Sequence, residues 1–235
     1  MRPVLTLPQW NPESPGVALR SAAGDPVALL AERTICDPAF DACITTNPGA
    51  TIIAWSGTMS DPRDDPFAPD PAAWLPASMP ALLARLESLE PLLVAQRVRL
   101  LIRSHARHIL SDAPRCGVLL RAPWRSTHPH IGLALDPAAM VEPSMVPTAL
   151  DHIRRSLEAL AHRASIVILT NFIAPDPAVP DAALHPARLA EGVIPAPELN
   201  ALATALIPAD CPLAVLEGDA AAHPDLGRAP RYTAA

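Results

Sequence analysis

The sequence predicts an α/β fold built on a parallel β-sheet. Its strand-like segments are short and rich in Val, Ile and Leu, and they lack the apolar–polar alternation of a sheet with one wet face. Helical patterns fall between several of these segments, and strands that alternate with helices form right-handed parallel crossovers. Alternation of this kind builds either a closed barrel or an open sheet with helices on both faces.

Apolar runs predict strands along the whole chain. Before residue 56 these runs follow one another too closely for full helices to fit between them. The expected strands are Val4–Leu7, Gly16–Arg20, Asp41–Thr45, Thr51–Trp55, Val98–Arg103, Ile131–Asp136, Ser165–Asn171 and Leu213–Glu217.

Leucines at helical spacing predict the helices. Asp70 followed by Pro71 is typical of a helix start, and the helix that follows is expected to be kinked or divided at Pro91. Further helices are expected over Asp25–Arg33, over Thr148–Arg163 and after Pro195, each from a stripe of aliphatic residues on one side.

Two insertions rich in Pro are expected to be loops, Ser56–Pro69 and Ile173–Gly192. We find no internal repeat and no linker between domains. The sequence therefore predicts one domain over residues 1–219, followed by a flexible tail over 220–235.

Composition excludes several classes of function. The chain has 235 residues, half of them hydrophobic, and all 18 basic residues are Arg, so chemistry that needs a lysine is excluded. A net charge of −6 argues against nucleic acid as a partner, because such binding needs a basic face. No apolar run is long enough to span a membrane, so we expect a cytoplasmic protein.

The chain from about Thr51 to Asp219 carries motifs that resemble a known family. They match the pattern of the xylose-isomerase-like TIM barrels, the superfamily of sugar and sugar-phosphate isomerases and epimerases. The motifs are TIIAWSG (Thr51–Gly57), VRLLIRSH (Val98–His105), IGLALDPAAMV (Ile131–Val141), SIVILTNF (Ser165–Phe172) and EGVIPAPELNALATALIPADCPLAVLEGD (Glu191–Asp219). The resemblance implies a (β/α)8 TIM barrel, here irregular in its N-terminal third, with its active site at the carboxyl ends of the strands.

The resemblance also implies a divalent metal, which catalysing members hold with Glu, Asp, His and Glu from successive strand ends. In this chain Asp136 matches the Asp and Glu217 matches the last Glu, but Arg103 takes the first Glu position and Ile168 takes the His position. A guanidinium repels a metal ion. We therefore expect the metal site of the family to be degraded, and the sequence names no cofactor in its place.

We expect Arg103 to lie beside Asp136, within reach of Glu217, and to replace the positive charge of the lost metal. Several interpretations of this group stay open. It can be an ion pair that closes a dead site, an anion site that Arg103 forms with His105, Arg107 and His108, or a metal site with shifted ligands. Asp136 can also cap the turn that starts at Pro137.

These expectations define one functional hypothesis and one alternative. The first is a sugar isomerase/epimerase-like barrel that binds a small polyhydroxy or anionic ligand, with Asp136 and Glu217 as general acid/base groups. The residues expected to bind the substrate are Arg103, His105, Trp55 and Asn171. The alternative is a barrel without catalytic activity that serves as a partner or scaffold protein.

Overall fold

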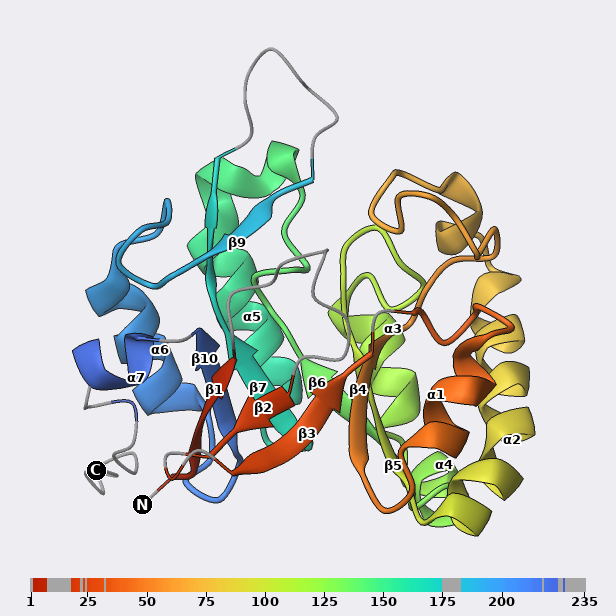
Figure 1. Ribbon diagram of the computed structural model, residues 1–235. Coiled ribbons are helices and arrows are strands. Elements are labelled where there is room, and N and C mark those ends of the chain that lie inside the picture. Colours follow the sequence, from red (N-terminus) through yellow and green to blue (C-terminus); the bar gives the residue numbers. More distant parts are fainter. Residues whose placement is uncertain are drawn as a thin grey trace.

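In the computed structural model the chain forms a closed eight-stranded barrel with helices around it (Figure 1). The structure describes residues 2–7, 18–21, 23, 25–31, 33–174, 183–216, 218–223 and 226. Around the ring the strands follow the order β1-β10-β7-β6-β5-β4-β3-β2. The TIM barrel expected from the sequence is confirmed, and an open sheet is excluded.

All but one of the barrel strands run parallel. The exception is β2, which is antiparallel to both β1 and β3 and has a register shift between Leu19 and Arg20. The N-terminal third is therefore irregular, as expected. The barrel strands are β1 (Val4–Leu7), β2 (Ala18–Arg20), β3 (Pro26–Leu30), β4 (Thr51–Trp55), β5 (Arg99–Arg103), β6 (Ile131–Leu135), β7 (Ile166–Leu169) and β10 (Leu213–Leu216).

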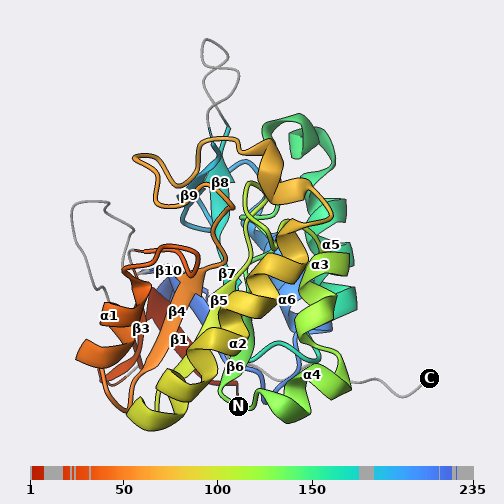
Figure 2. The same cartoon turned by 90° about the vertical axis from the view of Figure 1, so that its right-hand side faces the viewer.

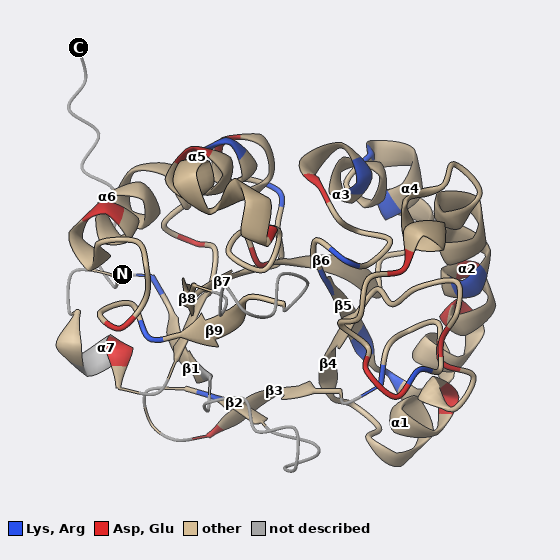
Figure 3. Ribbon diagram, turned by 90° about the horizontal axis from the view of Figure 1, so that it is seen from above, with Lys and Arg blue, Asp and Glu red and all other residues tan. Residues whose placement is uncertain are grey.

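Helices lie outside the ring of strands, as the view from above shows (Figure 3). The long helix α2 crosses the outside of the barrel beside α3 (Figure 2). The α-helices are α1 (Phe40–Thr46), α2 (Ser78–Gln96), α3 (Ala113–Leu119), α4 (Ala122–Thr127), α5 (Ala149–Leu160), α6 (Ala196–Leu206) and α7 (Asp219–Ala222). Two 3₁₀ helices, η1 (Pro71–Trp74) and η2 (Pro143–Thr148), complete them. No helix in the described part of the chain has the length and hydropathy needed to cross a bilayer.

Two predictions near the N-terminus are wrong, and each is the reverse of the other. The segment expected to be a helix, Asp25–Arg33, contains strand β3, and the strand expected over Asp41–Thr45 lies within helix α1. The connection between the parallel strands β3 and β4 has to cross outside the sheet, which favours a helix there. Phe40 and Ile44, four residues apart, supply the buried face of that helix.

Two further details differ from the expectation. Helix α2 is not divided at Pro91 but continues to Gln96. The strand expected over Ser165–Asn171 ends at Leu169, and a separate strand β8 (Asn171–Ile173) pairs with β9 (His185–Ala187) in a small antiparallel sheet. The region expected to be a loop after Ile173 thus contains half of this second sheet. Of the expected tail, residues 220–223 and 226 are described, and the first three of these belong to α7.

The barrel interior is filled by aliphatic side chains from alternate strand positions. Because successive side chains of a strand point to opposite faces, one set faces the barrel axis and the other faces the helices. The inward set forms its own apolar cluster, made of Leu5, Leu19, Ala28, Ile53, Leu101, Ala134, Ile166, Ile168, Ala214 and Leu216. The interior is therefore a packed core, and a ligand can be held only at its end.

Buried Arg2 joins the N-terminus to helix α6. Its guanidinium donates to the backbone carbonyls of Ala203 and Leu226 at 3.2 and 3.4 Å, and also to Ile207. It thereby supplies a donor to the carbonyl of Ile207, the C-cap residue of α6, and connects this helix end to residue 226.

We expect Arg2→Met to lower the free energy of unfolding by about 2 kcal/mol, because buried carbonyls then lose their donor. Urea unfolding of this variant and of the exposed control Arg163→Met would measure the difference. If both variants lose equally little stability, the buried hydrogen bonds of Arg2 do not stabilise the fold.

Candidate site at the barrel mouth

The inward-facing side chains at the carboxyl ends of the strands meet at one end of the barrel. Each of these residues stands two positions after an inward-facing core residue: Trp55 follows Ile53, and Arg103 follows Leu101. Asp136 and Thr170 follow β6 and β7 in the same way. The polar residues after the apolar strands thus meet at the carboxyl ends, as the sequence predicted.

These strand ends surround a cavity of about 320 Å³. This volume is at the lower end of the range for ligand sites, about 300–1,000 Å³. Loops and the small β8–β9 sheet complete its wall. The lining residues are Leu30, Trp55, Asp65, Phe67, Arg103, His105, Ala106, Arg107, Ala138, Ala139, Val141, Glu142, Thr170, Asn171, Phe172, Ala183, Leu184, His185, Pro186 and Leu216.

Arg103 and Asp136 form a buried ion pair. Nε and Nη2 of Arg103 donate to the same carboxylate oxygen, Oδ2, at 2.9 and 2.5 Å. The other oxygen, Oδ1, accepts the backbone N–H of Ala139 at 3.1 Å, so the carboxylate also caps the turn after β6. The side chains of Arg103 and Asp136 are 6% and 1% exposed. The expected contact between Arg103 and Asp136 is therefore present.

The third nitrogen of Arg103 remains available to a ligand. Nη1 makes no hydrogen bond with any described residue, and Arg103 lines the cavity. Trp55 covers the guanidinium, with Cζ lying 4.0 Å from the ring centroid. Held by Asp136 and stacked on Trp55, the guanidinium has little freedom to move, and the two N–H groups of Nη1 find no partner within the described ranges.

The described residues at these strand ends do not fit a divalent metal. Both oxygens of Asp136 are occupied, one by a guanidinium and one by a backbone N–H. Ile168, at the position of the family's His, packs in the barrel interior. No group of three or more His, Cys, Asp or Glu residues suited to a metal occurs in the described ranges. A hard cation at Asp136 would have to displace Arg103.

His105 contributes a neutral hydrogen-bond donor. Its Nδ1 accepts the backbone N–H of Arg107 at 3.1 Å, so the proton of the neutral ring sits on Nε2. Burial lowers the pKa of His105 well below its usual range, and the charges of nearby His108, Arg103 and Arg107 lower it further. The ring therefore stays uncharged near neutral pH. Its Nε2 has no partner among the described residues.

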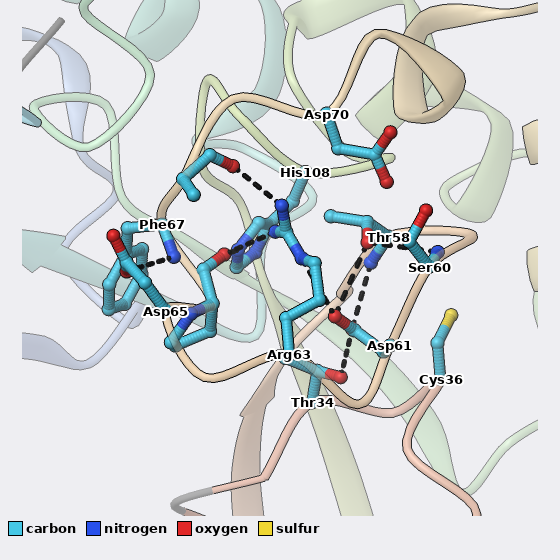
Figure 4. A network of polar contacts seen from close by, with 12 residues as sticks. Thr34, Cys36, Thr58, Ser60, Asp61, Arg63, Asp65, Phe67, Asp70 and His108 are labelled. Atoms are coloured by element: carbon cyan, nitrogen blue, oxygen red, sulfur yellow. Dashed lines mark hydrogen bonds and ion pairs between the residues drawn. The ribbon is translucent and has the colours of Figure 1, made fainter.

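The loop expected over Ser56–Pro69 folds over one side of the mouth and is fixed by its own polar network (Figure 4). Asp61 accepts the hydroxyl of Thr34 and the N–H of Thr58, and Arg63 donates to the Pro66 carbonyl at 2.7 Å. Gly57 begins the loop with a φ of +77°, where a Cβ would also collide with Thr34.

This network presents Phe67 to the cavity. The Phe67 ring stacks on His108 at 5.5 Å and packs edge-on against Trp55 at 5.4 Å. Buried His108 hydrogen-bonds to the Pro66 carbonyl at 2.8 Å, while its Nδ1 has no partner among the described residues. His108 is therefore part of the support of the loop, and it does not line the cavity.

Four polar residues of the cavity were missed by the sequence analysis: Glu142, Thr170, Asp65 and His185, the last of which begins β9. Glu142 follows the turn after β6, and its Oε1 lies 3.4 Å from Nε of Arg107 without a hydrogen bond. Thr170 follows β7, and Asp65 lies in the loop over the mouth. The position of Thr170 could have been found by counting two residues on from Ile168. Glu142 and Asp65 lie in irregular segments, where no periodic pattern indicates direction.

The remaining predicted site residues have different environments. Trp55 lines the cavity as expected. Asn171 also borders it, but its amide donates to the carbonyls of Leu189 and Ile194 and its oxygen accepts two backbone N–H groups. A Cβ on Gly192 would lie only 2.1 Å from Cγ of Asn171. The hydrogen bonds of the Asn171 side chain therefore hold the 189–194 loop, and Asn171 has no spare donor or acceptor shown for a ligand. Glu217 lies outside the described residues.

Comparison with known proteins gives similarity only to solved structures. No protein-family model and no curated protein matches the chain. A xylose isomerase-like TIM barrel protein from Mycobacterium smegmatis, in complex with magnesium, is 12% identical with a TM-score of 0.43. The resemblance expected from the sequence is found. The probable 3-DHS dehydratase AsbF from Bacillus anthracis is 15% identical, with a TM-score of 0.46. The 3-keto-D-glucoside 4-epimerase YcjR from E. coli is 13% identical, with a TM-score of 0.37.

The matches cover a larger share of this chain than of the three solved structures. They include 76%, 75% and 79% of this chain, and 58%, 60% and 65% of the three structures in the same order. The chain thus spans less than two thirds of the length of each of them. What they share is a fold, and the function has to be inferred from the residues of the mouth.

Proposed function

We propose that this chain is a sugar isomerase/epimerase-like barrel that binds a small anionic or polyhydroxy compound at its mouth and does so without the metal of that family. The observation that carries the proposal is the Arg103 guanidinium. It is buried and held by Asp136, and its Nη1 is available at a cavity. Such a guanidinium is suited to bind a carboxylate or phosphate oxygen.

The residues around Arg103 take distinct roles in this proposal. Arg103 binds the anionic group, and Nε2–H of His105 donates a second hydrogen bond. Trp55 orients the guanidinium and forms part of the wall. Asp136 acts as a positioning residue, because both of its oxygens are occupied and it does not line the cavity.

Catalysis by proton transfer needs a group that contacts the ligand and can exchange a proton. Among the described residues, the carboxylates that line the cavity are Glu142 and Asp65. Glu217 remains a candidate on the basis of the sequence pattern alone. The alternative, a barrel without activity that acts as a partner or scaffold, is favoured by the engagement of Asp136 with Arg103.

The proposal is tested by calorimetric titration with glucose 6-phosphate and with benzoate. The variant Arg103→Met with Asp136→Leu removes the guanidinium without leaving a buried carboxylate. Arg99→Met is the matched control, because Arg99 lies at the opposite end of the same strand. We expect at least one anion to bind the wild-type protein and the control, and to bind the double variant at least about tenfold more weakly.

Two results would speak against binding at the mouth. If neither anion binds the wild-type protein, or if the double variant binds both unchanged, Arg103 is not an anion site. The scaffold alternative then becomes the better account of the chain.

A further inference from the structure

We infer that the ligand of this mouth is a hydroxylated monocarboxylate with an apolar body, rather than a sugar phosphate. The inference rests on the proposed function and makes it more specific. It follows from three properties of the cavity: its walls, its balance of charge, and the presence of Glu142 in its lining.

The walls of the cavity are mostly apolar. A sugar carries a hydroxyl on nearly every carbon, and each hydroxyl that enters such a site without a partner loses its hydrogen bonds to water. The side chains without polar atoms that form the walls include Leu30, Phe67, Val141, Phe172, Leu184 and Leu216. A compact ring or alkyl body fits these walls better than a polyhydroxy chain does.

The charges at the cavity favour a single negative charge on the ligand. The buried Arg103 is already neutralised by Asp136, and Arg107 is paired with Glu142. A phosphate monoester near neutral pH brings about two negative charges. The two arginines that line the described part of the cavity, Arg103 and Arg107, each already have a carboxylate partner, so the second charge would not be neutralised. A carboxylate brings one charge, and Nη1 of Arg103 with the neutral His105 can satisfy its oxygens.

Glu142 supplies an acceptor in the same cavity. One carboxylate oxygen, Oε1, is buried and lies 3.4 Å from Nε of Arg107. The second oxygen, Oε2, has no hydrogen bond with any described residue, and the side chain is 24% exposed and lines the cavity. A carboxylate oxygen accepts hydrogen bonds and donates none, so it favours a ligand that presents a hydroxyl.

The experiment is a calorimetric titration with benzoate, 3-hydroxybenzoate, 4-hydroxybenzoate and glucose 6-phosphate. The proteins are the wild type, the Arg103→Met and Asp136→Leu double variant, Glu142→Gln, and the exposed control Glu158→Gln. We expect one hydroxybenzoate to bind the wild type about tenfold more tightly than benzoate. In Glu142→Gln this advantage should shrink, because a neutral amide oxygen is a weaker acceptor than a carboxylate, and benzoate itself should bind at least as tightly, because Arg107 loses its carboxylate partner. The thermal midpoint of each variant shows that it is folded.

The other outcomes separate this inference from the proposed function. If glucose 6-phosphate binds more tightly than benzoate and both hydroxybenzoates, the inference is overturned. The proposed function still holds in that case if the binding of glucose 6-phosphate depends on Arg103. Equal affinities for benzoate and both hydroxybenzoates, or a hydroxyl advantage that is undiminished in Glu142→Gln, would overturn the role of Glu142. No Arg103-dependent binding of any of the four compounds would overturn both.

Discussion

Replacing only Arg103 with Met is expected to lower the free energy of unfolding by about 3–5 kcal/mol, because the Asp136 carboxylate is left buried without its partner. Asp136→Leu alone should cost a similar amount, since it leaves a buried guanidinium. The double variant should recover most of this loss, because an apolar pair of similar volume avoids the desolvation of two charges. Urea unfolding of the four proteins gives the coupling energy directly.

A small part of the loss should persist in the double variant. After Asp136→Leu no carboxylate accepts the N–H of Ala139, and losing such a cap costs about 1 kcal/mol. The ion pair between Arg154 and Asp151 on the surface of α5 serves as the comparison, and Arg154→Met should have little effect because that pair is open to solvent. Additive effects of the two substitutions at Arg103 and Asp136 would contradict the account of a coupled buried pair.

Stability should fall as the pH drops below about 6.5, through the two buried histidines beneath the mouth. Burial lowers the pKa of His108 to about 4, and it lowers the pKa of His105 well below the usual range. Both values lie below those of the unfolded chain, so between pH 6.5 and 4 the unfolded state binds more protons. Stability is therefore complete above pH 6.5, and His108 alone should remove about 2 kcal/mol of it by pH 5.

Urea unfolding at pH 7 and pH 5 measures this dependence. His108→Gln should reduce the loss between the two pH values, even though the variant itself is less stable at pH 7. His162→Gln is the control, because His162 is exposed on the surface after α5. If the His108 variant and the control lose the same stability between pH 7 and pH 5, His108 does not titrate in the way its burial requires.

The sequence predicted best those barrel strands that are buried on both of their faces. Strands β4, β5 and β6 are covered by the core on one side and by helices on the other, so they appear as apolar runs that no helical pattern imitates. The reversed pair near the N-terminus shows where this fails. Val27 and Leu30 are three apart, as on a helix face, but they lie in β3, which pairs with the short antiparallel β2. The spacing of apolar residues within one segment does not show which other strand that segment pairs with.

The candidate site was predictable in part for the same reason. Arg103 and Asp136 end neighbouring parallel strands, so the order of strands in the barrel fixed their contact. Asn171 was expected at the mouth too, but β7 ends at Leu169 and the chain enters a second sheet, which turns its amide to the 189–194 loop. Phe67 and Glu142 reach the cavity from irregular segments that contact Arg107, which donates to the Phe67 carbonyl and lies beside the Glu142 carboxylate. A periodic pattern in the sequence does not indicate such contacts.

In the proposed function, the Arg103 guanidinium occupies the place at the mouth where the xylose-isomerase-like barrels hold a metal, and it binds an anion there. A crystal structure of the protein grown with magnesium and 3-hydroxybenzoate tests it most directly. We expect the Arg103–Asp136 pair to be intact, with a carboxylate oxygen of the ligand within hydrogen-bond distance of Arg103 Nη1. A magnesium ion coordinated by Asp136, with Arg103 turned away from it, would contradict the account.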